Sequence, residues 1–235
     1  MARKRKTGFN ILTILILLCF ILVLVYLQRY KANPIIELPK PPYPFISHGI
    51  DVSHHQGDIN WPRVIDSFDS INPFVYCKAT EGISHVDRKF KQNVEQLIEL
   101  NVKHGAYHFF LPHADAIDQA NHFLSEYNFQ QDDLPPVLDY EIESENNDEQ
   151  LDKISTWLKR VEDKTGKRPI IYTSYNIYIN WLSIALPDYS FWVANYSDKV
   201  YRFKKDNILH WQYSEKGVIN GIDGFVDLNY SKVKF

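Results

Sequence analysis

The chain has 235 residues, of which 45% are hydrophobic and 23% charged, a balance that excludes a disordered or fibrous protein and indicates a folded globular one. Two cysteines, Cys19 and Cys77, are too few for a disulfide framework, a four-cysteine zinc site or an iron–sulfur cluster. Residues 48–235 carry 19 Lys and Arg against 28 Asp and Glu, a net charge of −9 that argues against nucleic acid as a partner.

The N-terminus has the pattern of a membrane anchor. Four basic residues at positions 3–6 precede a run over residues 9–27 that is apolar except for Asn10 and Thr13. Such a run can cross a hydrocarbon core as a helix, and the basic flank, residues 1–8, is expected to stay in the cytoplasm. The alternative is a cleaved signal peptide, but the run is longer than usual and no small-x-small cleavage site follows it. We therefore predict one transmembrane helix over residues 9–27.

Residues 28–47 are predicted to form a linker. Five prolines fall within residues 33–47, and the segment has neither a helical nor a strand period. This composition is typical of a semi-rigid, extended spacer. A single domain over residues 48–235 should follow it.

Within that domain, short runs of β-branched and aromatic residues alternate with helical patterns, which is typical of βα units and a largely parallel sheet. The expected strands cover residues 46–53, 73–79, 102–110, 136–141, 169–174, 190–196, 208–213 and 225–229. The expected helices cover residues 87–101, 114–127, 148–165 and 175–186, with Asn147 as the N-cap of the third.

The final connections do not fit a regular barrel. Residues 197–207 are barely long enough for a crossover helix, and residues 214–224 are rich in Gly and polar residues, like a hairpin loop. The predicted fold class is α/β, an irregular (β/α) TIM-like barrel with antiparallel or poorly closed final strands. The alternative is an open α/β sheet.

Two carboxylates end the fourth predicted strand. In the segment 134–141 (LPPVLDYE), strand alternation places Asp139 and Glu141 on one face and Leu138 and Tyr140 on the other. Barrel active sites lie at the C-terminal ends of strands, and like charges held close raise the pKa of one group. Cleavage of a glycosidic bond needs such a proton donor beside an ionised carboxylate. Acids two apart also arise by chance, but only this pair follows an apolar strand.

Two further acids interrupt apolar strands, Asp51 in the first and Asp227 in the last. An unpaired carboxylate is costly to bury, so each needs a reason to be there. The first and last strands of a barrel are neighbours, and we expect the two acids to flank one site. The alternative for each is a strand-end cap or a salt bridge.

Eight segments resemble, in order, the strands of the family 25 glycoside hydrolases. They are residues 49–53 (GIDVS), 74–82 (FVYCKATEG), 105–109 (GAYHF), 138–141 (LDYE), 171–174 (IYTS), 192–196 (WVANY), 211–214 (WQYS) and 226–229 (VDLN). Members of this family are lysozymes that cut the β-1,4 bond between N-acetylmuramic acid and N-acetylglucosamine. The resemblance covers residues 48–235.

The resemblance implies catalytic roles for four acids. Glu141 would be the general acid, and Asp139 would orient the substrate's own N-acetyl group as the internal nucleophile, giving net retention. A direct carboxylate nucleophile is the competing mechanism. Asp51 and Asp227 match the family's other site acids, which hold charge and hydrogen bonds around the pair.

Aromatic rings near the strand ends suit sugar binding, because sugars present apolar faces that stack on such rings. We expect a subset of five to line the cleft and the rest to pack in the core: Tyr107, Tyr172, Trp192, Trp211 and Tyr213. Lys78 and Glu81 follow the second strand as rim contacts or as solvent-exposed residues.

The prediction is a monomeric muramidase that binds peptidoglycan glycan strands, in wall remodelling or turnover, with its domain periplasmic or facing the cell wall. We expect no cofactor, and no metal, because the spacing of the nine histidines does not suit ligands. The alternatives are a catalytically inactive module that binds wall glycan and a related hydrolase acting on chitin.

Overall fold

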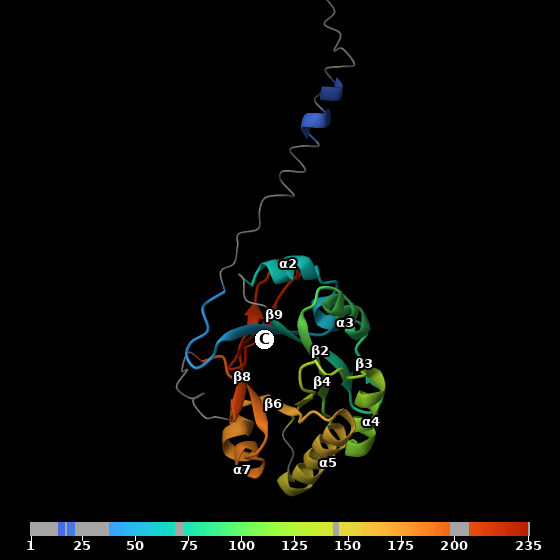
Figure 1. Cartoon of the computed structure of the whole chain (residues 1–235), viewed down its shortest axis with the longest axis vertical. Helices are drawn as coiled ribbons and strands as arrows, with labels where there is room; N and C mark the ends of the chain where they lie inside the picture. Colours follow the sequence, from blue (N-terminus) through green and yellow to red (C-terminus); the bar gives the residue numbers. More distant parts are fainter. Residues whose placement is uncertain are drawn as a thin grey trace, which may run out of the picture. The chain divides into compact units, whose positions relative to one another are not determined.

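The computed structural model describes residues 14–16, 18–21, 38–68, 73–142, 146–197 and 207–234. The chain divides into two compact units, Met1–Ile35 and Ile36–Phe235. The second unit contains the whole predicted domain, and it is a barrel of strands with helices on its outside (Figure 1).

Eight strands close the barrel. Their order around it is the order of the chain, and β1 pairs with both β2 and β9. The strands are β1 (Ser47–Val52), β2 (Phe74–Glu81), β4 (Lys103–Phe109), β5 (Val137–Asp139), β6 (Ile170–Ser174), β7 (Ser190–Ala194), β8 (Ile208–Gly217) and β9 (Val226–Ser231). A two-residue strand, β3 (His85–Val86), pairs with the end of β2 outside this ring.

The sheet is closed, not poorly closed or open. The ring strands from β1 to β8 run parallel to their neighbours, whereas β9 is antiparallel to both β8 and β1. The polar segment between β8 and β9 acts as a hairpin connection, as its composition predicted. Because this hairpin brings β9 back along β8, its free edge meets β1 and completes the ring.

The helices follow the predicted pattern with local differences. They are the 3-10 turn η1 (His54–Gln56), α2 (Trp61–Asp66), α3 (Phe90–Glu99), α4 (Ala116–Glu126), α5 (Asn147–Thr165), α6 (Tyr175–Ile177), the π turn η2 (Tyr178–Leu182) and α7 (Ser183–Ala185). The N-cap of α5 is Asn146, whose side chain accepts a hydrogen bond from Glu149 N at 3.2 Å, rather than the predicted Asn147. α2 was not predicted, since six residues are too few to show a helical period.

Strand alternation sorts side chains into two layers. Outward residues such as Leu138 and Tyr140 are fully buried in the core beneath the helices. A separate hydrophobic cluster fills the barrel interior: Phe74, Tyr76, Leu134, Val137, Ile170, Tyr172 and Trp192. Gly49 makes room for it, because a Cβ there would lie 2.5 Å from the Phe74 ring. This cluster therefore closes part of the barrel interior, and the interior is open near the C-terminal ends of the parallel strands.

The prediction of an N-terminal transmembrane helix needs correction. No helix in the described part of the chain is long and apolar enough to span a membrane. A spanning helix needs about 20 residues, whereas within residues 9–27 the structure describes only helical residues 14–16 and 18–21. The rest of this segment, the flank 1–8 and residues 28–37 of the linker lie outside the described residues.

Candidate active site

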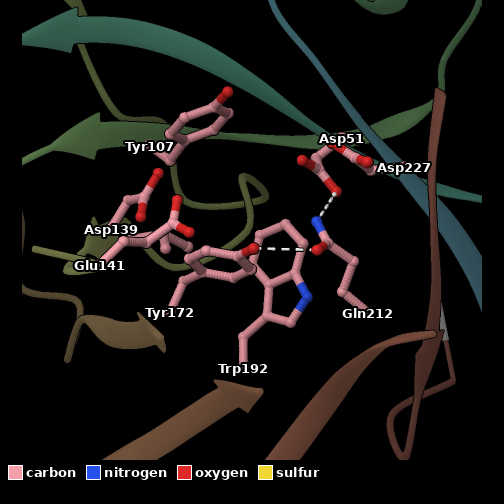
Figure 2. Close-up of a pocket in the computed structure, with 9 residues that line it drawn as sticks. Asp51, Tyr107, Asp139, Glu141, Tyr172, Trp192, Gln212 and Asp227 are labelled. Carbon is pink, nitrogen blue, oxygen red and sulfur yellow. Dashed lines mark hydrogen bonds between the residues drawn. The ribbon is translucent and has the colours of Figure 1, made fainter. Parts of the chain in front are cut away.

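A pocket of about 90 Å³ opens at the end of the barrel where the parallel strands have their C-termini. Figure 2 shows two groups of carboxyls facing each other across it, Asp139 with Glu141 on one side and Asp51 with Asp227 on the other. Its lining residues are Asp51, Tyr107, Val137, Asp139, Glu141, Tyr172, Trp192, Gln212 and Asp227. All four acids singled out from the sequence thus meet in one pocket.

The first carboxyl pair comes from β5 and the residues just after it. Val137, Asp139 and Glu141 line the pocket, whereas the intervening Leu138 and Tyr140 are buried on the outer face. This is the alternation that the sequence predicted. Two backbone hydrogen bonds, from Phe110 N to Asp139 O and from Tyr140 N to Tyr172 O, both 2.9 Å, fix the end of the strand.

Asp139 and Glu141 interact strongly. Burial raises the pKa of Asp139 well above its usual value, and the charge of Glu141 and a hydrogen bond with it raise this pKa further. Glu141 is exposed at the pocket mouth, yet partial loss of hydration raises its pKa as well. Two carboxyls can share a hydrogen bond only if one is protonated, so the pair holds one proton between its two titration steps. Asp139, the more buried member, holds this proton more firmly in the free protein.

The second pair joins neighbouring strands, because Asp51 of β1 lies opposite Asp227 of β9 in the antiparallel register. Burial raises the pKa of Asp51 to about 6, although hydrogen bonds from amides oppose this. The pKa of Asp227 is raised to about 9 by burial and then by the charge of Asp51. Near neutral pH, Asp51 is therefore the ionised member and Asp227 the protonated one.

Two buried amides hold Asp51 in place. Its Oδ2 accepts hydrogen bonds from Asn229 Nδ2 at 2.8 Å and from Gln212 Nε2 at 3.1 Å. Gln212 Oε1 in turn accepts from the hydroxyls of Tyr172 at 2.9 Å and Tyr196 at 2.8 Å (Figure 2 shows the first). These contacts leave the Gln212 amide a single orientation, so Asp51 is a fixed charge.

Sequence reasoning missed Gln212 and Asn229. The signal that could have found them is again alternation. Asn229 follows Asp227 by two residues, and Gln212 stands between two large rings in an apolar strand. A buried amide on an inward face needs a polar partner, and Asp51 provides it for both.

Three of the five predicted rings line the pocket, namely Tyr107, Tyr172 and Trp192. Trp192 is only 1% exposed, and its Nε1 donates to Asn229 Oδ1 at 2.9 Å, so it forms the floor rather than a stacking wall. Tyr107 is half-buried, and Tyr172 meets the Trp192 ring edge-on at a centroid distance of 5.0 Å.

Trp211 and Tyr213 do not line the pocket, which corrects the prediction for these two rings. Both lie on the outward face of β8, because Gln212 takes the inward position between them. Trp211 is 4% exposed and donates from Nε1 to Asn195 O at 2.7 Å. Tyr213 stacks on Tyr230 at a centroid distance of 4.0 Å. Both rings therefore stabilise the outer core.

Among the described residues, no group of three or more His, Cys, Asp or Glu side chains could hold a metal ion. The pocket instead offers carboxyls with raised pKa, hydroxyls and one ring floor. These are the groups for acid catalysis on a polar, uncharged bond such as a glycosidic bond.

A carboxyl pair at the C-terminal ends of barrel strands suits the hydrolysis of a glycosidic bond, and comparison with known proteins shows the family. The family model "Glycosyl hydrolases family 25" matches residues 50–222. The chain belongs to this family, and it is a lysozyme-type glycoside hydrolase.

Three relatives illustrate the similarity. The uncharacterized protein YegX of Escherichia coli O157:H7 is 40% identical over 215 residues, which cover 87% of this chain and 76% of YegX. Lysozyme M1 of Streptomyces globisporus is 32% identical over 198 residues, covering 77% of this chain and 66% of that enzyme. The solved structure of a family 25 glycosyl hydrolase from Bacillus anthracis superposes with a TM-score of 0.73 at 27% identity, covering 81% of this chain and 91% of that one.

Proposed function

We propose that this protein hydrolyses peptidoglycan at the β-1,4 bond between N-acetylmuramic acid and N-acetylglucosamine, with net retention of configuration. The observation that carries the proposal is the Asp139–Glu141 pair, two neighbouring carboxyls of raised pKa at the mouth of an acidic pocket. Kinship with Lysozyme M1 supports the choice of substrate.

Glu141 is the group placed to protonate the leaving oxygen, because it is the exposed member of the pair. In the free protein the proton is held more firmly by Asp139. Asp139 Oδ1 is buried and accepts no hydrogen bond from the described residues. When the N–H of a substrate acetamido group donates to Asp139, it favours the ionised form of that carboxyl and moves the proton to Glu141. Substrate binding would thus leave Glu141, the general acid, in its protonated form.

The same contact would hold the acetamido oxygen against the anomeric carbon. Attack by that oxygen forms the C–O bond of an oxazolinium ring while the glycosidic C–O bond breaks and Glu141 gives its proton to the leaving sugar. Water, deprotonated by Glu141, then opens the ring with net retention. Asp51, the fixed carboxylate across the pocket, stabilises the positive charge that develops on the sugar.

The competing mechanism uses a carboxylate as a direct nucleophile. The two mechanisms differ for glycans whose muramic acid residues lack the N-acetyl group. Participation of the acetamido group predicts that bonds next to de-N-acetylated muramic acid stay intact, whereas a carboxylate nucleophile would still cleave them.

The proposal is tested with the full-length protein on purified peptidoglycan and on chitin. Fragments are reduced with borohydride and their ends are identified by mass spectrometry. We expect reduced muramic acid at the new ends, and the first anomer seen by proton NMR should be β. Cleavage of chitin alone would support the related chitin hydrolase, and binding of both glycans without new ends would support the inactive module.

Because peptidoglycan lies outside the cytoplasm, we also propose that the domain acts there, in wall remodelling or turnover. Digestion of intact cells and of lysed cells with an added protease tests this placement. Protection of the domain in permeabilised but unlysed envelopes would contradict it.

A further inference from the structure

Lys78 lies beside the acidic pocket, and the mechanism above does not use this lysine. Lys78 is on the inward face of β2, two residues after Tyr76 and in register with Tyr107 of β4, which lines the pocket. Only 11% of its side chain is exposed. A cation at this position is unusual in the barrel interior, because burying a charge is costly unless it is paired.

Two contacts hold the ammonium group. Lys78 Nζ donates to Glu81 Oε2 at 2.6 Å, and it lies 4.8 Å from the centroid of the Phe109 ring. Phe109 pairs in register with Asp139 on the next strand. The ammonium group is therefore fixed on the side of the pocket where β4 meets β5, next to the carboxyl pair.

We propose that Lys78 and Glu81 form a counter-charge pair that sets the pH range over which Asp139 and Glu141 hold their single proton. Both are positioning residues that act through the acids rather than on substrate. The inference rests on the proposed function, since it assigns a role to the proton that Glu141 delivers.

The physical basis is the sign of the two charges. Lys78 favours the ionised forms of its neighbours and lowers the pKa of both Asp139 and Glu141, against the larger effect of burial. Glu81 lies against the same ammonium group and partly cancels its field. Removing the cation should therefore raise the proton affinity of the pair, and removing the anion should lower it.

Other charges act on the same region and must stay constant in the test. The titratable groups that face Lys78 or the pair come from β1, β4, β5, β6 and β9, and from the outer side of β4: Asp51, Tyr107, Asp139, Glu141, Tyr172, Asp227 and His108. All of these residues remain in place in the variants at positions 78 and 81, which remove only the charges of Lys78 and Glu81.

The experiment measures kcat and kcat/KM for peptidoglycan against pH in Lys78→Met and Glu81→Gln variants of the full chain. Met keeps the apolar stem over Phe109 without the charge. In Lys78→Met we expect the acidic and the alkaline limb of the pH–activity profile to move to higher pH by about one unit. This magnitude follows from the Coulomb interaction of two charges a few ångströms apart in a partly solvated site. The limbs of Glu81→Gln should move down by a smaller amount.

The matched control is a Lys–Glu pair of similar geometry on the outer helix α5. Lys153 Nζ lies 2.8 Å from Glu149 Oε1, and neither residue lines the pocket. Lys153→Met and Glu149→Gln should leave both limbs where they are in the wild type.

Unshifted limbs, or limbs that move the same way in both variants, would overturn the inference. A rise of KM alone in Lys78→Met would show that the lysine contacts substrate instead. If Lys78→Met does not fold, Lys78→Arg and Glu81→Gln still test the inference. Arg keeps the positive charge, so Lys78→Arg should keep the wild-type pH profile, whereas that of Glu81→Gln should move down. Loss of all cleavage by the wild type, or full activity of Glu141→Gln, would refute the proposed function itself and is thus distinguishable.

Discussion

The two carboxyl pairs of the pocket, Asp51 with Asp227 and Asp139 with Glu141, have different surroundings. Asp51 and Asp227 come from neighbouring strands, and amides of Gln212 and Asn229 bind Asp51 directly. Among the described residues no amide side chain is seen to bind Asp139 or Glu141, and Asp139 Oδ1 has no hydrogen-bond partner there. The first pair is therefore built to hold a charge in place, and the second to pass a proton on.

This difference follows from hydrogen-bond donors rather than from burial, because Asp51 and Asp139 are almost equally buried, at 8% and 6% exposed. Two amide donors oppose the burial of Asp51 and keep its pKa near 6. Asp139 instead has a second acid beside it, which raises its pKa further. Donors stabilise the ionised form and like charges the protonated form.

The largest effect is expected when the proton-passing pair loses its acid. Glu141→Gln keeps the shape but cannot donate a proton, so kcat on peptidoglycan should fall by roughly 10² to 10⁴-fold, the usual contribution of a general acid. The thermal midpoint should stay close to the wild type, and Glu149→Gln on α5 serves as the control. An active Glu141→Gln enzyme would contradict the claim that the Asp139–Glu141 pair passes on the catalytic proton.

An intermediate effect is expected in the stability of the folded protein, through the pair Asp51 and Asp227. The pKa of Asp227 is about 9 when folded and near 3.8 when unfolded, so the unfolded chain binds fewer protons between these values. Stability should therefore fall as pH rises through this window and level off above it.

Asp227→Asn removes this dependence. The variant should match the wild type in mildly acidic solution and exceed it at alkaline pH by on the order of 1–3 kcal/mol, measured from urea midpoints. A wild-type stability that rises from pH 5 to pH 9 would show that the pair does not share a proton.

The smallest effect concerns the hydroxyls that hold Gln212, which in turn binds Asp51. Tyr196→Phe removes one of two hydroxyls that donate to Gln212 Oε1, while Tyr172 still donates at 2.9 Å. One hydrogen bond of about 1 kcal/mol corresponds to a loss of kcat/KM of roughly five-fold. A loss as large as that of Glu141→Gln would mean that Tyr196 contacts the reacting sugar instead.

The sequence predicted the parts of the site that depend on strand alternation. Asp139 and Glu141 follow a clear apolar strand, and their shared face could be read from their spacing. The rings at 211 and 213 were misplaced because composition does not say which face of β8 is inward. That choice is made by Gln212, whose partner Asp51 is 161 residues away in the chain. Barrel closure likewise depends on the pairing of β1 with β9, which local patterns do not encode.

The central claim is that Asp139 and Glu141 share one proton between two coupled titration steps, and carbon-13 NMR of the side-chain carboxyls tests it most directly. The full-length protein is labelled at Asp and Glu, and the two resonances are assigned with Asp139→Asn and Glu141→Gln variants. We expect two coupled titration steps that are visible in both resonances, the upper one well above the usual range of an Asp carboxyl. Two independent carboxyls that are both fully ionised in mildly acidic solution would contradict it.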